Sequence, residues 1–278
     1  MMKRLSALCL VFVMVLGLCA CGKSKTPEEI MQETAKNMEA MKSYSMSLGM
    51  EMAMSANGMT LPMKVTSSSE VTVKPMVMHT KMDMSMGMLG SMKMEMYVEE
   101  SGDKSNTYMQ MVTADGQKSP WQKQEGPATQ NMVMDSTKAM KMLTNLKVAE
   151  DKEEVNGVKA LRIDGELTGK NMLDMFKSMS SSMGGAQGME MLNPENEEIL
   201  KTMEGASMKV TYFINEDDMT LVSAKLDMTE MMKKIPTGTE GLSFDKMEMT
   251  MGFSDFNKFD KIEIPAEALN GELIPNAQ

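Results

Sequence analysis

Methionine alternates with polar residues along much of the first half of the chain. Residues 81–96, KMDMSMGMLGSMKMEM, contain seven methionines, and every one occupies an even-numbered position. Successive side chains of a β-strand point to opposite faces of the sheet, so this period of two predicts strands with one apolar face. The same alternation predicts strands over residues 44–54, 59–73, 76–88 and 92–96, and a further strand that carries Met109 and Met111.

The lengths of the loops decide whether the apolar faces of neighbouring strands agree. Residues directly opposite in an antiparallel pair point to the same face. We predict hairpins that begin with the pairs Met54–Met59, Val73–Met76 and Met88–Met92, the last across the three-residue loop Leu89-Gly90-Ser91. These registers place the methionines of all the strands on one face, whereas a shift by one residue would turn half of them into solvent.

Eight methionines of this face are the candidates to line a site for an apolar ligand. They are Met50, Met52, Met63, Met84, Met86, Met94, Met96 and Met109. The opposite face carries polar side chains, among them Glu51, Lys64, His79, Lys81, Asp83, Lys93 and Glu95. Because His79 falls in this polar row, we expect it to be a solvated surface residue rather than a ligand.

The first helix has a clear start signal. Thr26-Pro27-Glu28-Glu29 combines an N-cap threonine, a proline in the first helical position and a glutamate three residues after the cap. Apolar residues at helical spacing follow, and together these features predict a helix over residues 27–41.

The second half of the chain repeats the strand pattern less strictly. Asn156-Gly157 is a signal for a hairpin with a two-residue turn. The other predicted elements are helices over residues 136–145 and 172–183 and strands over residues 208–214, 220–226 and 247–253. No break is marked enough to divide the chain into two domains, so we expect one sheet with helices on one face.

The N-terminus has the features of an exported lipoprotein. Lys3 and Arg4 precede an almost wholly apolar run over residues 5–20, which is short for a membrane span and typical of a signal peptide. The run ends in Leu18-Cys19-Ala20-Cys21, which resembles the bacterial lipobox. This resemblance implies cleavage before Cys21 and attachment of fatty acids such as palmitate to its thiol and its new amine. The alternative is an ordinary secretory signal with incidental cysteines.

These N-terminal features set the expected organisation of the chain. We expect a lipoprotein signal peptide at residues 1–20, a lipidated tether at 21–27 and a single domain at 28–278. The lipid would hold the protein on the extracytoplasmic face of the cell membrane. An acidic chain with a net charge of −10 needs such acyl chains, because electrostatics would not attract it to an anionic membrane.

Composition excludes several classes of function. The negative net charge argues against a nucleic-acid partner, since phosphate binding needs a basic face. One histidine does not build a catalytic dyad or a histidine zinc site. Cleavage before Cys21 would remove two of the three cysteines and leave the third lipidated, so the mature chain has no thiol nucleophile. We find no phosphate-binding glycine loop and no nucleophile elbow, and we predict no catalytic residue, no metal ligand of the histidine or cysteine type, no cofactor and no enzymatic activity.

The order of elements resembles a known family. The lipobox is followed by MEAMKSY at residues 38–44, by MKVTYFIN at 208–215, and by FSDFN at 253–257 with IEIP at 262–265. This series is similar to the lipoproteins of Gram-positive bacteria related to LolA and LppX. The resemblance implies an α+β fold, in which a curved antiparallel sheet forms an unclosed half-barrel with helices that cover its concave face. It also implies a cavity for acyl chains, as in LolA-like and LppX-like proteins.

Several interpretations of the methionines remain open at this point. In the first interpretation they simply fill the space between sheet and helices, since methionine adapts to irregular gaps. The second interpretation is a Met-lined cavity that binds a lipid or another apolar ligand, and we take it as the expected function. The alternatives are binding of a soft metal, Cu(I) or Ag(I), by thioethers of Met-x-Met pairs, and a structural envelope protein without a ligand.

Overall fold

The computed structural model of the 278-residue chain describes residues 25–56, 58–87, 90–113, 115–127, 140, 142–169, 171–172, 205–234 and 242–274. Helices lie at α2 (Pro27–Glu39), α6 (Thr229–Met232) and α7 (Ala266–Leu269). Strands of the first half are β1 (Ser43–Ala56), β2 (Met59–Val73), β3 (Met76–Ser85), β4 (Ser91–Ser101), β5 (Lys104–Val112) and β6 (Gln122–Pro127). Those of the second half are β7 (Thr144–Val148), β8 (Glu153–Val155), β9 (Val158–Thr168), β10 (Ser207–Asn215), β11 (Leu221–Asp227), β12 (Leu242–Ser254) and β13 (Glu272–Leu273).

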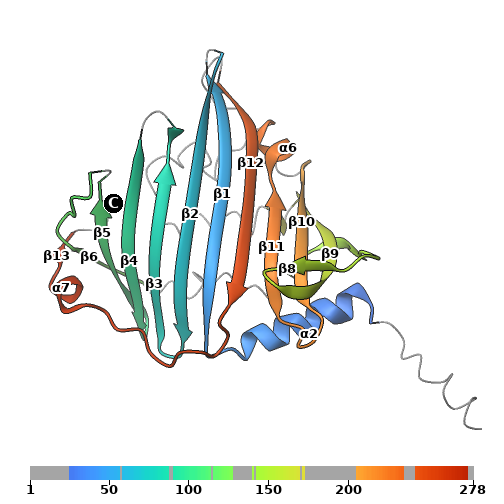
Figure 1. Cartoon of the computed structure of the whole chain (residues 1–278), viewed down its shortest axis with the longest axis horizontal. Coiled ribbons are helices and arrows are strands. Elements are labelled where there is room, and N and C mark those ends of the chain that lie inside the picture. The colour runs from blue at the N-terminus through green and yellow to red at the C-terminus, as the bar shows by residue number, and fades with distance from the viewer. Residues whose placement is uncertain are drawn as a thin grey trace, which may run out of the picture.

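All these strands belong to one open sheet (Figure 1). The strand order is β13-β6-β5-β4-β3-β2-β1-β12-β11-β10-β9-β7, and β8 pairs with β9 outside this series. Every pairing is antiparallel except that of β13 with β6. The edges β13 and β7 lie far apart, so the sheet does not close into a barrel, as expected for an unclosed antiparallel sheet.

The predicted first helix is confirmed, together with its cap. The Thr26 side chain accepts a hydrogen bond from the Glu29 backbone N–H, and the Glu29 side chain accepts one from the Thr26 N–H. Pro27 occupies the first turn, where its missing N–H costs nothing. The helix ends at Glu39, two residues before the predicted end. None of the described helices is both long and apolar enough to cross a bilayer.

The methionine meander is confirmed, but two of its three predicted registers are wrong. Val73 lies opposite Met76 as predicted. The β1–β2 hairpin begins with Ala56 opposite Met59, because its turn is two residues long instead of four. The β3–β4 hairpin begins with Ser85 opposite Ser91, because five residues separate the strands instead of three. The first error is a shift of two residues and the second a shift of four, with Met84 opposite Met92 instead of Met96. Even-numbered shifts leave every side chain on its predicted face.

The second half of the sheet is confirmed where it is described. Asn156 and Gly157 both have positive φ angles, 53° and 75°, and place Val155 opposite Val158 in a two-residue turn. β10 and β11 form the predicted antiparallel pair, but Val210 lies opposite Leu226, two residues from the pairing with Ala224 that the alternating pattern predicts. Half of the predicted helix over 136–145 lies outside the described residues; Met140 is helical, and residues 144–145 belong to β7 instead. The helix predicted over 172–183 lies outside the described residues beyond Met172.

Buried side chains form cores on both faces of the sheet. The face that carries the methionines, here called the methionine face, holds the largest core. Ile30, Met31 and Ala35 of α2 and Met231 and Met232 of α6 pack there with side chains of β9 to β12. The described helices therefore cover the β9–β12 end of this face. Coverage of the whole concave face by helices, which we expected, is not seen among the described residues.

The opposite face, here called the polar face, has a smaller core that the sequence did not predict. After β12 the chain runs along the lower rim of this face to α7 (Figure 1). Ile262 and Ala268 of this C-terminal segment are buried against Tyr97 of β4 and Tyr108 of β5. Because these tyrosines belong to the rows that we expected to be solvated, part of the polar face is in fact covered.

Candidate functional site

Strand pairing arranges the methionine face as rows that run across the strands. One row reads Met249, Met50, Val65, Met84, Met92 from β12 to β4. The next reads Met251, Leu48, Ser67, Met82, Met94, Met111, and a third reads Phe253, Met46, Ser69, Thr80, Met96, Met109. Since neighbouring strands are about 4.8 Å apart, thioethers of one row lie within reach of one another.

Seven of the eight predicted lining residues lie on this face by their strand register. They are Met50 and Met52 on β1, Met63 on β2, Met84 on β3, Met94 and Met96 on β4, and Met109 on β5. The eighth, Met86, follows the end of β3, and its backbone N–H donates to the carbonyl of Gly90. All eight side chains are half-buried. They are therefore brought together on one side of the sheet.

Burial decreases along the methionine face from β1 toward β5. Met50 and Met52 pack against the largest core, and Met96 packs against a second core around Tyr44 and Val98. Among the described residues, several half-buried methionines belong to no core cluster: Met63, Met82, Met84, Met86, Met94 and Met109. At the margin, Met92 and Met111 are 38% and 45% exposed. The apolar surface thus extends well beyond the packed core.

Two polar features interrupt the methionine face. The hydroxyls of Ser69 and Thr80 are buried 2.9 Å apart and satisfy each other. Glu100 continues the row of even-numbered β4 residues on this face, and one of its carboxyl oxygens is buried without a hydrogen-bond partner among the described residues. Burial raises the pKa of this carboxyl above its ordinary value. Glu100 is therefore a carboxyl group held in an apolar setting.

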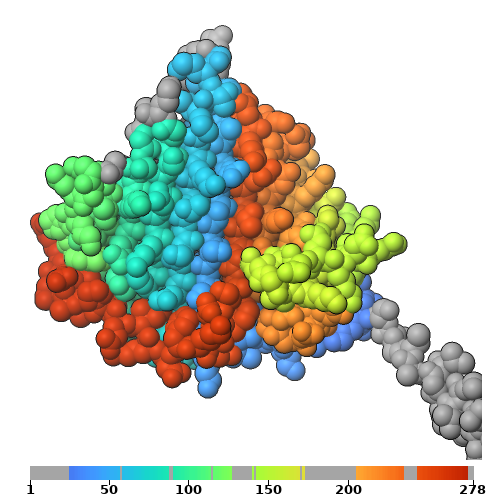
Figure 2. Space-filling model, viewed as in Figure 1, coloured from blue at the N-terminus to red at the C-terminus, as the bar shows by residue number. Residues whose placement is uncertain are grey.

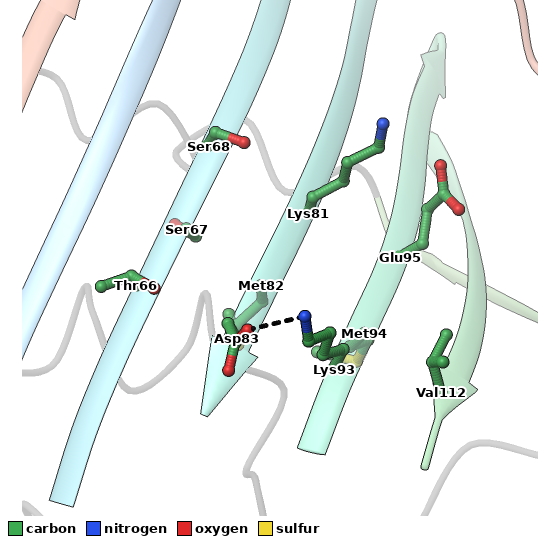
Figure 3. Close-up of a pocket in the computed structure, with 10 residues that line it drawn as sticks. All are labelled: Thr66, Ser67, Ser68, Lys81, Met82, Asp83, Lys93, Met94, Glu95 and Val112. Atoms are coloured by element: carbon green, nitrogen blue, oxygen red, sulfur yellow. Dashed lines mark ion pairs between the residues drawn. The ribbon is translucent and has the colours of Figure 1, made fainter. Parts of the chain in front are cut away.

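The hollows of the described surface lie on the polar face instead. Three open hollows have volumes of about 450, 430 and 320 Å³. The first is lined mostly by polar residues of β2, β3 and β4, among them Asp83 and Lys93, which form an ion pair at 3.2 Å (Figure 3). Met82, Met94 and Val112 also line it. Sequence reasoning missed these hollows, which bring together residues of several strands, and in the 430 Å³ hollow also Pro265 and Glu267 of the C-terminal segment.

His79 lies in one of these hollows and is not the solvated residue that we expected. Its side chain is 16% exposed, and its Nε2 atom lies 2.9 Å from a carboxylate oxygen of Glu95. The imidazole stacks on the Tyr97 ring with centroids 4.2 Å apart and an interplanar angle of 3°. The prediction was wrong because Tyr97 is shielded by the C-terminal segment, and His79 stacks on that buried ring.

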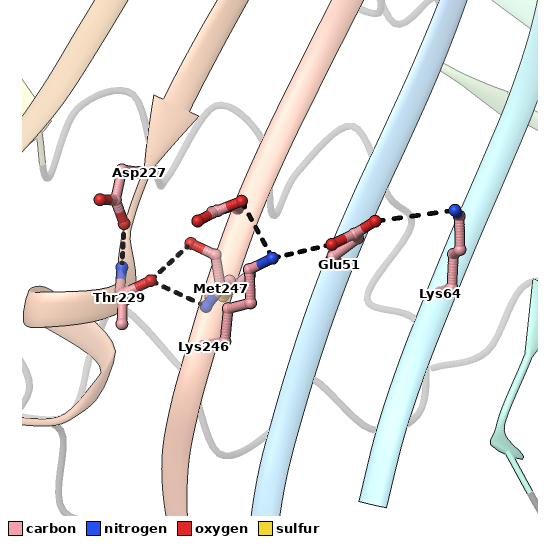
Figure 4. Close-up of polar contacts among 7 residues, drawn as sticks. Glu51, Lys64, Asp227, Thr229, Lys246 and Met247 are labelled. Carbon is pink, nitrogen blue, oxygen red and sulfur yellow. Dashed lines mark hydrogen bonds and ion pairs between the residues drawn. The ribbon is translucent and has the colours of Figure 1, made fainter.

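A charged network occupies the other end of the polar face (Figure 4). Glu51 lies between Lys246, at 2.8 Å, and Lys64, at 3.6 Å, and Lys246 also pairs with Glu248. The hydrogen bond from Lys246 lowers the pKa of the Glu51 carboxyl. These groups are exposed and neutralise one another, so they act as a solvated structural network.

The described residues contain no group of three or more histidine, cysteine, aspartate or glutamate side chains placed to hold a metal ion. The thioether rows are a different donor set. Met94 lies opposite Met82 on one side and Met111 on the other, so that three sulfur-bearing side chains meet across three strands.

Comparison with known proteins decides the family. The model of a family of unknown function, DUF6612, matches residues 26–272. The chain belongs to this family. No curated protein matches it.

Solved structures similar to the family member described here include mycobacterial proteins. LprF from Mycobacterium bovis is 12% identical, with a TM-score of 0.50 over 87% of this chain and 97% of that one. The lipoprotein LppX from Mycobacterium tuberculosis is 11% identical over 85% and 98% of the two chains, with a TM-score of 0.43. A DUF1329 family protein from Desulfovibrio piger is 9% identical over 84% and 93%, with a TM-score of 0.26. The expected resemblance to LppX-like lipoproteins is thereby confirmed, and at these identities it concerns the fold.

Proposed function

We propose that this protein is a membrane-anchored extracytoplasmic lipoprotein that binds the acyl chain of a lipid against the methionine face of β2 to β5. The anchor would be the acylated Cys21, which lies outside the described residues. The observation that carries the proposal is the group of half-buried methionines that no described core cluster includes. A face of this kind is apolar, adaptable in shape and incompletely packed, and these are the properties that a flexible hydrocarbon chain needs.

The energetics are compatible with a long acyl chain. Each buried methylene contributes about 0.8 kcal/mol. Association costs roughly 4–15 kcal/mol in lost freedom. Burial of the methylenes of a chain of about sixteen carbons contributes enough free energy to exceed much of this cost, whereas burial of a short-chain acid does not. The proposal therefore concerns long acyl chains.

The fold gives further support. LprF shares the open antiparallel sheet over nearly the whole chain. In the LolA-like arrangement that the sequence resembles, helices cover the concave face, and we propose that the same holds for the methionine face here. The described helices α2 and α6 already pack on its β9–β12 end. An acyl chain would then lie between the sheet and this helical cover.

The test is binding of a fluorescent sixteen-carbon fatty acid to the purified full-length chain, together with mass spectrometry of lipids that co-purify. The variant pair Met84→Gln with Met94→Gln keeps side-chain length but places two amides on the methionine face. We expect at least about tenfold weaker binding, because an amide without a partner is costly in an apolar site. Lys81→Gln places the same amide on the opposite, polar face of the sheet, so it should leave binding of the fatty acid unchanged. Equal binding by all variants, or no binding by the parent, would contradict the proposal.

A soft-metal site is the second candidate, because Met82, Met94 and Met111 meet across three strands. Thioethers select Cu(I) and Ag(I) over harder ions. Titration with Cu(I) against a competing chelator measures this directly, and Met94→Gln removes the central donor. Stoichiometric Cu(I) without co-purifying lipid would replace the lipid proposal by this one. A chain that binds neither ligand would have the structural role in the envelope.

A further inference from the structure

We propose that the polar face carries a second ligand site, a trough that binds an uncharged oligosaccharide chain. This inference is independent of the lipid proposal, because it concerns the opposite face of the sheet and a different class of ligand. It rests on the shared lining of the three hollows, on their walls, and on the chemistry of their floor.

The three hollows adjoin one another, and we describe them together as one trough. Ser68 and Lys81 line both the 320 and the 450 Å³ hollows, and Glu95 lines both the 450 and the 430 Å³ hollows. The trough therefore crosses the strands, from Ser254 of β12 at one end to Trp121, just before β6, at the other. At about 4.8 Å between neighbouring strands, this path measures roughly 25–30 Å. Such a length suits an extended chain of several residues rather than a single small molecule.

Segments distant in sequence provide the walls of the trough. The C-terminal segment bounds its lower rim and contributes Pro265 and Glu267 to the lining. The β8–β9 hairpin lies at the other end (Figure 2), where the Asn156 amide comes near Gly252 of β12. A Cβ atom at position 252 would lie 2.6 Å from the Ser47 hydroxyl oxygen. Gly252 therefore leaves room for this hydroxyl at this end of the floor. The trough is thus bounded at both ends and along one side.

The floor offers polar groups without partners. Ser47, Ser68 and Lys81 follow one another in a single row across β1, β2 and β3. Their side chains have no hydrogen-bond or ion-pair partner in the part of the chain that the structure describes. A serine hydroxyl both donates and accepts, and a lysine donates. A ligand that is rich in hydroxyl groups complements such a row, because each hydroxyl also donates and accepts.

The charges of the lining favour an uncharged ligand. Positive side chains alternate with negative ones along the trough: Lys81, Lys93 and Lys118 against Glu70, Asp83, Glu95 and Glu267. A polyanion would be repelled by the carboxylates along the trough, because like charges in close contact raise the free energy of the complex. A neutral polyhydroxyl chain avoids that cost and hydrogen-bonds to both signs.

Aromatic rings give the trough a rigid base at the β4–β6 end. His79 stacks on Tyr97, and Tyr97 lies 5.8 Å from Trp121 at a tilted angle. Glu95 holds the imidazole from the side. Trp121 is half-buried and lines the hollow beside Pro265. An indole that is apolar on its face and fixed in place is a platform on which the C–H face of a sugar ring can pack.

A bound peptide fits this geometry less well. Extended peptides pair with the edge of a sheet, where backbone groups are free. The trough instead crosses the middle of the sheet, where β1 to β5 already have partners on both sides. Only side chains are offered there, and they are of the kind that recognises hydroxyl groups.

The test measures binding of chitohexaose, an uncharged oligosaccharide, by titration calorimetry with the full-length chain. Ser68→Gln places a longer side chain where two hollows join, and Trp121→Ala removes the platform. We expect each to weaken binding at least about tenfold. Thr250→Gln makes a similar exposed change on the polar face outside the trough and should bind like the parent. Ser68→Gln is the decisive variant, because Trp121→Ala also touches the C-terminal core.

The outcomes separate the alternatives. Saturable binding that Ser68→Gln weakens and Thr250→Gln does not supports the proposal. The absence of saturable binding overturns it, and so does equal binding by both variants. Tighter binding of an anionic comparator, a heparin hexasaccharide, would show that charge rather than hydroxyl recognition governs the trough and would also overturn it. Met84→Gln alone, at a residue that lines none of the three hollows, should leave chitohexaose binding unchanged, which keeps this result apart from the test of lipid binding.

Discussion

At the scale of single residues, Glu100 and Glu51 experience opposite environments on the two faces of the sheet. Glu51 lies exposed between two lysines, and its pKa is lowered by the hydrogen bond from Lys246. Glu100 lies on the methionine face with a buried oxygen that no described group pairs, and burial raises its pKa. The folded state therefore favours the charged form of Glu51 and the neutral form of Glu100.

Glu100→Gln should make the protein less sensitive to alkaline pH. A carboxyl whose pKa is raised in the folded state contributes its full stability below its unfolded pKa of about 4.5, and this contribution is lost as the pH rises through the folded value. Glutamine stays neutral throughout. We expect a gain of about 1 kcal/mol at pH 8, about 2–4 °C in Tm for a chain of this size, and no gain at pH 4.

Thermal unfolding at the two pH values measures this difference. Glu125→Gln is the control, since a hydrogen bond from Lys123 lowers the pKa of that exposed carboxyl. It should give no increase in Tm at pH 8. A Glu100→Gln protein with the same Tm as the parent at both pH values would contradict the prediction.

At the scale of secondary structure, the sequence predicts the faces of the strands better than their registers. A run in which every second residue is methionine offers nearly equal partners when one strand slides by two residues, so the pattern alone does not choose between such registers. The lengths of the turns decide which register forms. Gly58, with a φ of 80°, closes the β1–β2 turn in two residues. The Asn156-Gly157 signal is unambiguous, and there the predicted pairing of Val155 with Val158 is correct.

The start of α2 gives a prediction at this scale. Thr26→Ala removes the side-chain oxygen that accepts from the Glu29 N–H. The expected cost is about 1 kcal/mol, because one backbone donor of the first turn loses its partner. Urea unfolding should show a lower midpoint with an unchanged slope. Thr26→Ser keeps the hydroxyl and should retain most of the stability, so an equal loss in both variants would contradict a capping role.

At the scale of the whole molecule, the sequence predicts one open sheet with its methionines on one side, and this is the arrangement observed. It does not predict the trough. The trough needs the C-terminal segment, the β8–β9 hairpin and the β1–β5 floor together, and contacts between segments so far apart leave no periodic signal in the chain. The only hint is the placement of the single histidine among charged and serine residues, which by itself is also typical of a solvated face.

The membrane anchor can be tested on the whole protein. Cys21→Ser removes the acylated thiol that the lipobox resemblance implies. We expect loss of radiolabelled palmitate incorporation and transfer of most of the protein from the membrane to the soluble fraction, since the acyl groups are the proposed attachment to the bilayer. Cys19→Ser changes a cysteine within the signal segment and should leave both readouts intact. Equal membrane retention in the two variants would contradict anchoring through Cys21.

The position of β12 has a consequence for how the molecule is made. This strand pairs with β1 on one side and β11 on the other, so in the strand order of the described sheet it joins the block β1–β6 to the block β9–β11. Until residues 242–254 have been synthesised, both blocks present unpaired backbone edges to their surroundings. A truncation just upstream of β12 would therefore produce two aggregation-prone half-sheets rather than a slightly smaller protein.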